Sequence, residues 1–324
     1  MLLGNGDGTF QPAIPSLLGV DANVVTAGDY NGDGRLDVAL LSDFGIITAL
    51  GDGQGRFQQP INYPAGGYAT GVATGDFNAD GKIDVAIANG NGFGVLSGLG
   101  GGQFQPKYSL QQDFLPAFAV SGDFNHDGVT DLVVAGSHGT LGGPPDGYQV
   151  YFGGSGGLTA GPLGTNVLVD MNSLITGRFR PGGNLDLAFA FNAGANYTSG
   201  VGVLLGNGDG SFKNPKLMLI PGNAAGVAAA DFNRDGKLDL VVGASAGELL
   251  LLGNGDGTFQ APQTITVPSG TYSAAATADL NGDGKADLVL ADSFDEQIVV
   301  LLGNGDGTSN PPRPSTPTKC RRVW

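Results

Sequence analysis

The chain repeats one nine-residue pattern, and this repeat constrains its fold more than any other feature. The first copy, Asp29–Asp37, reads Asp-x-Asn-x-Asp-Gly-x-x-Asp. Side chains that carry an oxygen stand at positions 1, 3, 5 and 9, and a glycine stands at position 6. In a tight loop such side chains converge on one centre, and the glycine permits the sharp turn that closes the loop. Four further complete copies occur at Asp76–Asp84, Asp123–Asp131, Asp231–Asp239 and Asp279–Asp287.

This set of oxygens predicts a calcium site in each complete copy. Ca²⁺ is a hard cation that prefers a flexible shell of oxygen ligands. A hairpin closed by its own aspartates, without metal, could explain one copy, but five copies favour about five bound Ca²⁺ ions. The predicted ligands are the side chains at positions 1, 3, 5 and 9 and the main-chain carbonyl at position 7. They belong to Asp29, Asn31, Asp33, Arg35, Asp37, Asp76, Asn78, Asp80, Lys82, Asp84, Asp123, Asn125, Asp127, Val129, Asp131, Asp231, Asn233, Asp235, Lys237, Asp239, Asp279, Asn281, Asp283, Lys285 and Asp287.

The pattern resembles the first nine positions of an EF-hand loop, but its surroundings differ. Position 12 is not a glutamate; in the first copy it is Leu40. The flanking residues are short runs of Ala, Val and Leu, which have the length of strands rather than helices. The sequence therefore predicts that each ion sits in the turn of a β-hairpin.

Composition agrees with a chain built from turns and strands. Glycine is the commonest residue, with 59 copies, and no window has a sustained helical period of apolar residues. The formal net charge is −15, but the five complete loops hold 15 of the 30 acidic residues, so bound calcium would neutralise most of it. An acidic chain lacks the basic face that nucleic acid binding needs.

A second motif alternates with the first. Its first copy, Gly4–Phe10, reads Gly-Asn-Gly-Asp-Gly-Thr-Phe. Asn-Gly and Asp-Gly are strong hairpin-turn dipeptides, so the motif predicts a turn between two strands with a phenylalanine packed beneath it. It has too few oxygens to hold a metal. Variants of it occur at Gly51–Phe57, Gly98–Phe104, Gly153–Leu158, Gly206–Phe212, Gly253–Phe259 and Gly303–Thr308.

The spacing of the two motifs predicts an all-β fold, a β-propeller of four-stranded blades. In the first repeat we expect strands at 24–28, 36–41, 46–50 and about 57–63, with the calcium loop between strands one and two. Adjacent loops start 47 or 48 residues apart, which is the length of a propeller blade. Small residues such as those at 26–28 precede the loops, as expected where first strands converge on a central channel.

A sixth loop position, Arg178–Asp186, has lost the calcium pattern. Arginines stand at positions 1 and 3 and a glycine at position 5, although the flanking strands 174–177 and 186–191 are intact. We expect this blade to keep the fold without the metal. Either a guanidinium takes the place of the ion and pairs with Asp186, or the segment is an exposed arginine-rich turn.

Six loop positions predict six blades, with seven as the alternative. The last repeat lacks an obvious fourth strand because residues 309–312 contain two prolines, whereas the segment 10–18 is an unpaired strand. We therefore expect the N-terminal strand to complete the last blade. The predicted propeller covers residues 1–308. Residues 309–324 are predicted to be a disordered, proline-rich basic tail, which holds the single cysteine, Cys320, and the single tryptophan, Trp324.

With both motifs placed, the chain resembles the FG-GAP/VCBS repeat family, whose repeat builds the integrin α-subunit propeller. The resemblance covers residues 1–308. It implies calcium ions on one face of a propeller and recognition of protein or carbohydrate, or adhesion, on the other. Integrin propellers have seven blades and usually fewer complete loops, so integrin ligands are not carried over. Similar propellers occur in fungal lectins and as accessory modules of polysaccharide-degrading enzymes.

These features favour an adhesion or recognition module that is not an enzyme. The alternatives are a calcium-stabilised lectin or a non-catalytic accessory module. Two histidines and a tail cysteine cannot form a nucleophilic triad, and the acids outside the loops, such as Glu248 and Asp292, are scattered. Calcium loops of this kind favour an extracellular or cell-surface location. We recognise no signal peptide and no apolar run of membrane-spanning length in the sequence, so we expect no membrane insertion. We expect that export signals were lost with upstream sequence; the alternative is that the protein stays inside the cell. We expect a monomer, which could belong to a longer chain.

The partner surface is predicted opposite the calcium loops, where strands two and three are connected. Two connectors are expanded, at 137–147 and 192–200. Loops on a rigid scaffold commonly carry specificity, although long surface insertions are also tolerated without a function. The candidate ligand-binding residues there are His138, Asp146, Tyr148, Asn196 and Tyr197.

Overall fold

The computed structural model describes most of the chain, and all of its regular structure is β-strand. The described residues are 1–14, 22, 24–42, 45–64, 69–89, 92–111, 115–137, 147–164, 170–193, 198–268, 272–292, 297–311 and 313–314. They contain no helix, which confirms the predicted all-β class. None of these residues forms an apolar helix that could span a bilayer.

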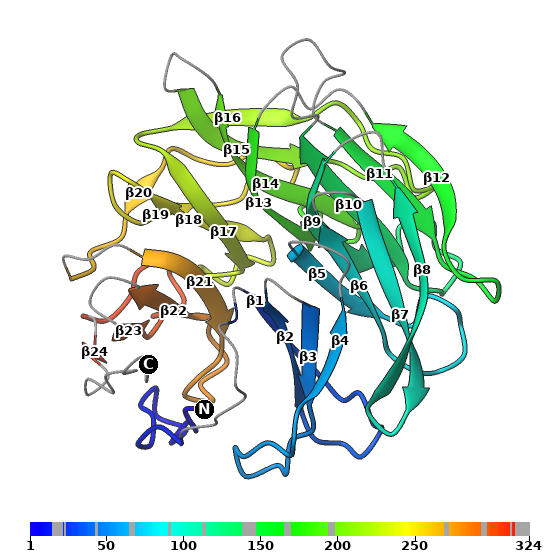
Figure 1. The fold of residues 1–324 in the computed structure, drawn as a ribbon. Helices are drawn as coiled ribbons and strands as arrows, with labels where there is room; N and C mark the ends of the chain where they lie inside the picture. The colour runs from blue at the N-terminus through cyan, green and yellow to red at the C-terminus, as the bar shows by residue number, and fades with distance from the viewer. Residues whose placement is uncertain are drawn as a thin grey trace. The chain divides into compact units, whose positions relative to one another are not determined.

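The strands form six antiparallel sheets of four strands each, and in each sheet the strands lie side by side in chain order (Figure 1). The chain divides into two compact units. The first comprises Met1, Ile14–Asp170 and Gly206–Asn214, and the second comprises Leu2–Ala13, Met171–Leu205 and the described residues from Pro215 onward.

The first unit holds the sheets β1–β4, β5–β8 and β9–β12. Their strands are β1 (Val24–Gly28), β2 (Asp37–Ser42), β3 (Gly45–Ala49), β4 (Ile61–Pro64), β5 (Ala69–Gly75), β6 (Asp84–Asn89), β7 (Gly92–Gly100), β8 (Gln103–Gln111), β9 (Leu115–Gly122), β10 (Asp131–Ser137), β11 (Gly147–Phe152) and β12 (Thr159–Gly164).

The second unit holds the sheets β13–β16, β17–β20 and β21–β24. Their strands are β13 (Asp170–Gly177), β14 (Asp186–Ala193), β15 (Thr198–Leu204), β16 (Lys216–Ile220), β17 (Ala224–Ala230), β18 (Asp239–Ala244), β19 (Leu249–Leu251), β20 (Gln263–Thr264), β21 (Tyr272–Ala278), β22 (Asp287–Asp292), β23 (Gln297–Leu301) and β24 (Arg313–Pro314).

The second and third strands of a sheet form its core. β3 is buried along its whole length, and β2 is buried except at one residue, whereas β4 is mostly exposed. A strand that is buried on both faces reads as a continuous apolar run, which explains the Val-, Leu- and Ala-rich sequences of the second strands. Buried side chains of neighbouring sheets form shared clusters within each unit, for example Leu41, Ile46, Val85 and Ile87 in the first unit.

The second motif forms the predicted turn between the third and fourth strands. The first glycine of the turn pairs with the last residue of the motif, as Gly51 pairs with Phe57 and Gly253 with Phe259. We call this last residue the turn-closing residue. The turn is fixed by side chains: the Asp256 carboxylate accepts bonds from the Thr258 amide at 2.9 Å and the Thr258 hydroxyl at 2.6 Å.

Turn-closing phenylalanines join neighbouring sheets within each unit. The rings of Phe104 and Phe259 pack edge-on against the aromatic side chain at position 2 of the nine-residue loop in the preceding sheet, which we call the loop aromatic. Phe104 lies 5.7 Å from Tyr30, and Phe259 lies 6.1 Å from Phe179, measured between ring centroids. Edge-to-face pairs of this kind add about 0.5–1.5 kcal/mol beyond the burial of their area.

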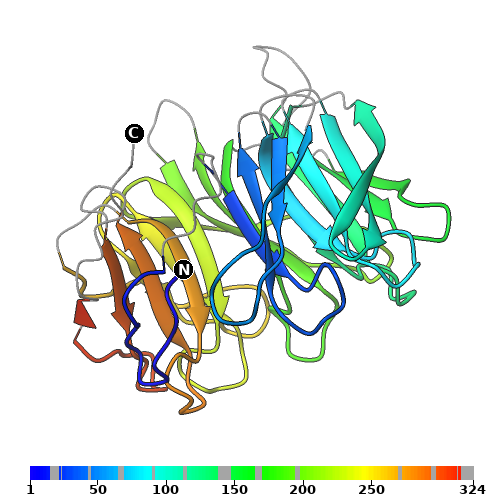
Figure 2. The same cartoon turned by 60° about the horizontal axis from the view of Figure 1, so that its bottom comes forward.

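The last sheet differs from the sequence prediction in its fourth strand. β24 pairs with β23 through Val299–Pro314 and Val300–Arg313, so the tail itself supplies this strand, and the N-terminal segment does not take its place. The N-terminal turn lies beside this sheet in the second unit (Figure 2). The two are in close contact, because a Cβ atom added at Gly8 would lie 2.5 Å from the Leu302 side chain. Residues 15–18 of the predicted N-terminal strand and the tail beyond residue 314 lie outside the described residues.

Candidate metal-binding loops

Each complete nine-residue loop connects the first and second strands of one sheet, as the sequence predicts. The carboxylate at position 1 closes the loop by accepting hydrogen bonds from main-chain amides. Asp29 Oδ1 accepts from Gly32 and Asp33 at 2.8 and 3.0 Å, and Asp29 Oδ2 accepts from Gly34 at 2.7 Å. The bond to the glycine at position 6 recurs in the other four loops at 2.8 to 3.1 Å.

Positions 3 and 5 extend the same arrangement. Asn31 Oδ1 accepts from the Asp33 amide at 2.8 Å, and Asp33 Oδ1 accepts from the Arg35 amide at 2.9 Å. Each of these oxygens has a second lone pair, and each carboxylate has a second oxygen. The main chain therefore fixes the positions of the side chains and leaves them able to bind a cation.

The loop backbone takes left-handed conformations at positions 4 and 6. Position 6 is always glycine in the five complete loops, and its φ lies between 77° at Gly284 and 83° at Gly128. Position 4 is glycine in two loops, but Ala79, His126 and Arg234 have φ values of 57°, 63° and 59° there. Non-glycine residues rarely adopt this region, because the Cβ atom approaches the backbone. The loop therefore has the same backbone conformation even where position 4 is a residue that disfavours a positive φ.

The aspartate at position 9 has a structural role that the sequence did not reveal. Asp37 is fully buried; its Oδ2 accepts from the Tyr30 amide at 2.9 Å and its Oδ1 accepts from the Gly51 amide at 2.8 Å. The carboxylate therefore ties the nine-residue loop to the hairpin turn of the same sheet. The same pair of bonds occurs at Asp84, Asp131, Asp239 and Asp287. A further role of these oxygens as metal ligands stays a prediction.

The carboxylates of a loop repel one another. Burial raises the pKa of Asp84, main-chain amides oppose this shift, and the charges of Asp80 and Asp76 raise the pKa further. Asp131 and Asp239 have raised pKa values for the same reasons. Cationic side chains at position 7 offset part of the charge at position 5: Lys237 Nζ lies 3.0 Å from Asp235 Oδ2.

The donor chemistry of the loops fits calcium. In the third loop, Asp123 Oδ1 is buried and has no hydrogen-bond partner, which is costly for a carboxylate oxygen unless a cation satisfies it. In the described part of the chain, no three His, Cys, Asp or Glu side chains converge on a common metal position. Besides the buried position-9 group, each loop offers only two carboxylates, so a full shell must also use the Asn amide oxygen and main-chain carbonyls. Ca²⁺ accepts such mixed oxygen ligands, whereas zinc prefers nitrogen and sulfur.

The sixth loop confirms that an arginine pairs with the position-9 aspartate. Arg180 Nη2 lies 2.7 Å from Asp186 Oδ1, and the Phe179 amide donates to Asp186 Oδ2 at 3.0 Å. Asp186 is fully buried. Arg178 Nη1 donates to the Gly183 carbonyl, which closes the turn from the other side. The guanidinium thus supplies the positive charge beside this carboxylate, and the alternative of an exposed arginine-rich turn is wrong.

The candidate ligand-binding residues are not borne out as a group. Tyr148 is wrong: its side chain is 3% exposed and packs edge-on against Phe212 at 5.3 Å, and burial raises the pKa of its hydroxyl to about 12. It is a core residue because it lies within β11 rather than in the preceding connector. His138, Asp146, Asn196 and Tyr197 lie outside the described residues.

One acidic residue outside the loops is unusual. Glu248, just before β19, is 3% exposed, and its Oε2 has no hydrogen-bond partner among the described residues. Burial raises the pKa of this carboxyl to about 7. The sequence places Glu248 next to a run of leucines, which is the only signal that could have indicated its burial.

Comparison with solved structures shows a shared fold. An Agrocybe aegerita lectin, studied for its specific recognition of non-reducing terminal N-acetylglucosamine, matches with a TM-score of 0.69 and 20% identity over 97% of this chain and 87% of the lectin chain. BBS1N, solved in complex with ARL6DN, matches with a TM-score of 0.66 and 12% identity over 95% of this chain and 87% of the matched chain. At these identities the likeness concerns the fold, which is all-β and β-propeller-like.

Comparison with curated proteins gives no significant match. The family model of the FG-GAP-like repeat, in contrast, matches five segments: residues 1–40, 42–87, 76–134, 183–242 and 239–290. These segments include all five complete loops and cover more than half of the chain. The chain therefore belongs to the FG-GAP-like repeat family.

Proposed function

We propose that the protein is a calcium-stabilised β-propeller that acts as an extracellular recognition module for protein or carbohydrate ligands. The calcium part of the proposal is supported by five loops that share one pattern of oxygen donors and the same hydrogen bond from the position-6 glycine to the position-1 aspartate. In the third of these loops, Asp123 Oδ1 is buried and has no hydrogen-bond partner. The recognition part rests on the fold shared with a lectin and with a protein-binding chain.

The residues that would hold each ion are the side chains at positions 1, 3 and 5, with the main-chain carbonyl at position 7 and the aspartate at position 9. In the third loop these are Asp123, Asn125, Asp127, Val129 and Asp131. A bound ion supplies positive charge among carboxylates that otherwise repel one another. Ligand side chains that main-chain amides already orient lose little conformational freedom on binding, which favours affinity.

We further propose that the six sheets are the blades of a single six-bladed propeller. Each sheet has four strands in chain order, with the nine-residue loop between the first and second strands. That arrangement puts every loop at the same end of its sheet, and the connectors between strands two and three at the other end. Specificity would then come from the connectors or from the contacts between sheets. An extracellular setting is proposed because modules of this kind bind calcium at millimolar concentrations.

Carbohydrate and protein ligands remain two candidates within this function, and one experiment separates them. The purified chain is applied to a glycan array in 2 mM calcium, and bound glycans are competed with free N-acetylglucosamine. Competed binding that disappears in excess EGTA supports a lectin. Absence of glycan binding, with calcium-dependent capture of a protein from conditioned medium, supports protein recognition. If the chain binds no calcium in a direct titration, the calcium part of the proposal is wrong.

A further inference from the structure

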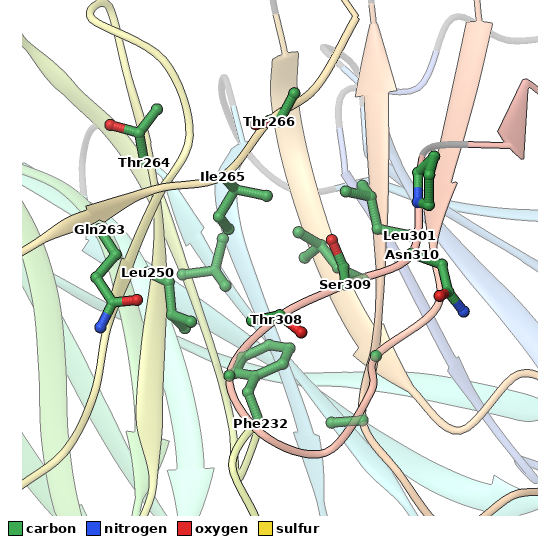
Figure 3. A pocket seen from close by; sticks show the side chains of 16 residues that line it. Phe232, Leu250, Gln263, Thr264, Ile265, Thr266, Leu301, Thr308, Ser309 and Asn310 are labelled. Atoms are coloured by element: carbon green, nitrogen blue, oxygen red, sulfur yellow. The ribbon is translucent and has the colours of Figure 1, made fainter.

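The second unit contains a cavity of about 380 Å³ between the sheet β17–β20 and the sheet β21–β24 (Figure 3). Its inner wall is apolar and includes Phe232, Leu250 and Leu301, which belong to the core cluster shared by these two sheets. Its rim is polar and includes Gln263 and Asn310. The cavity therefore combines an apolar interior with hydrogen-bonding groups at its mouth, which is the usual character of a small-molecule site.

The cavity lies where the turn-closing residue is a serine instead of a phenylalanine. Ser309 pairs with Gly303 as Phe259 pairs with Gly253 in the preceding sheet. The two turns also share their hydrogen bonds: the amide after Ser309 donates to the Leu302 carbonyl at 2.8 Å, and the amide after Phe259 donates to the Leu252 carbonyl at 2.8 Å. Ser309 is therefore the structural equivalent of a turn-closing phenylalanine.

The turn that carries Ser309 is docked in the same way as turns that carry a ring. The Gly307 amide donates to the carbonyl of the loop aromatic Phe232 at 3.1 Å, and the Gly210 amide donates to the carbonyl of Phe124 at 3.0 Å. In the second case Phe212 follows and packs edge-on against Phe124 at 5.6 Å. Beside Phe232 the backbone is in place, but the side chain that would fill the space has no ring.

We propose that this cavity binds one aromatic ring that carries a hydroxyl group, a ligand of the phenol class. The ring would take the place of the missing phenylalanine and pack against Phe232, which supplies the edge-to-face geometry seen in the other sheets. An apolar cavity of about 150 Å³ is already large enough to hold benzene, so this one has room for a substituted ring. Gln263 and Asn310 line the cavity, and their side-chain amides can bond to the ligand's polar group.

None of the residues that line the cavity is a predicted metal ligand, and the inference does not rest on the proposed recognition function. The test is a titration of the full chain with 4-methylphenol, followed by ligand-observed NMR. Wild type is expected to bind saturably. Ser309→Phe should weaken binding by a factor of ten or more because the new ring fills the cavity, whereas Ser309→Ala should stay within about threefold of wild type because the cavity is kept.

Stability gives a second readout of the same idea. Because Ser309→Phe restores a buried ring, it is expected to raise Tm by about 2–6 °C, and added 4-methylphenol should raise the Tm of wild type but not of this variant. If Ser309→Phe lowers Tm, a second variant, Ala286→Leu, fills the cavity from another lining residue and should abolish binding instead. Absence of saturable binding to wild type, or equal binding by wild type and both filled variants, overturns the proposal.

Discussion

The loops at Asp231–Asp239 and Arg178–Asp186 occupy the same place in neighbouring sheets but differ in what lies at their centre. In both loops the position-9 carboxylate is buried and accepts a hydrogen bond from the main-chain amide of the loop aromatic. The distance from this amide to Oδ2 is 2.9 Å at Asp239 and 3.0 Å at Asp186. The first loop adds three further oxygen-bearing side chains, whereas the second adds the Arg180 guanidinium. The comparison separates the framework, which both loops share, from the ligand set, which only one has.

The backbones of the two loops differ as well. In the complete loops the left-handed residues stand at positions 4 and 6, as at Arg234 and Gly236, whose φ values are 59° and 81°. In the sixth loop position 4 is Pro181, whose ring fixes φ near −65°, and the left-handed residue is Gly182 at position 5. The metal pattern therefore depends on a backbone shape as well as on the oxygens, and both have changed together.

Calcium removal should give the largest effect, because it acts on all complete loops and not on the sixth. With Kd values of about 10⁻⁴–10⁻³ M, 1 mM calcium stabilises each site by roughly 0.4–1.4 kcal/mol, or roughly 2–7 kcal/mol over five sites. Excess EGTA should lower Tm by about 4–20 °C in a thermal melt. Magnesium should restore little of this, because it demands octahedral geometry and dehydrates reluctantly. A melting curve that EGTA leaves unchanged contradicts the ligand assignment.

Removal of the position-9 carboxylate, which both kinds of loop share, should lower the free energy of unfolding by about the same amount in each. Asp239→Ala leaves the Phe232 and Gly253 amides buried without an acceptor, and Asp186→Ala leaves the Phe179 amide and the Arg180 guanidinium without theirs. Each variant should lose about 2–5 kcal/mol of unfolding free energy, measured by urea denaturation in EGTA. If only Asp239→Ala destabilises the protein, position 9 is not a shared framework residue.

Glu248 sharpens the comparison, because it is a buried carboxylate whose Oε2 has no hydrogen-bond donor among the described residues. Its pKa is raised from 4.5 to about 7, so the folded state binds the proton more tightly than the unfolded state. The protonated Glu248 carboxyl therefore makes its full contribution to the free energy of unfolding below about pH 4.5, and this contribution is lost as pH rises through 7. Glu248→Gln should be more stable than wild type by roughly 3 kcal/mol at pH 8 and by less than about 1 kcal/mol at pH 5. A difference that does not change with pH contradicts this.

A single-loop change should give the smallest effect. Asp33→Ala removes the position-5 ligand from one loop and leaves the buried Asp37 in place. The Asp33 side chain is partly exposed. In 1 mM calcium it should cost about 0.4–1.4 kcal/mol, and in EGTA it should cost less. The control is Gly182→Ala in the sixth loop, whose cost should not depend on calcium. Equal losses for Asp33→Ala with and without calcium would show that this loop holds no ion.

Much of this architecture could be predicted from the sequence, because the two motifs alternate at a fixed period. The all-β class and the turns follow from residue types at set positions. The pairing of an arginine with Asp186 was one of two alternatives that the sequence left open, and the structure decides between them. The structural role of position 9 could not be predicted from the sequence, because an aspartate there serves equally well as a metal ligand or as an acceptor for two amides. The strand β24 was missed because prolines interrupt it, although proline is tolerated on an edge strand.

The most direct test of the account is the number of calcium ions bound per chain, counted by equilibrium dialysis with metal analysis. Wild type should bind five. The variant Arg178→Asp/Arg180→Asn/Pro181→Gly/Gly182→Asp rebuilds both the ligand set and the backbone of the sixth loop, so it should bind six, whereas the same variant with Pro181 retained should bind five. A wild-type count near zero, or a count that these changes leave at the wild-type value, would contradict the assignment of the loops as calcium sites.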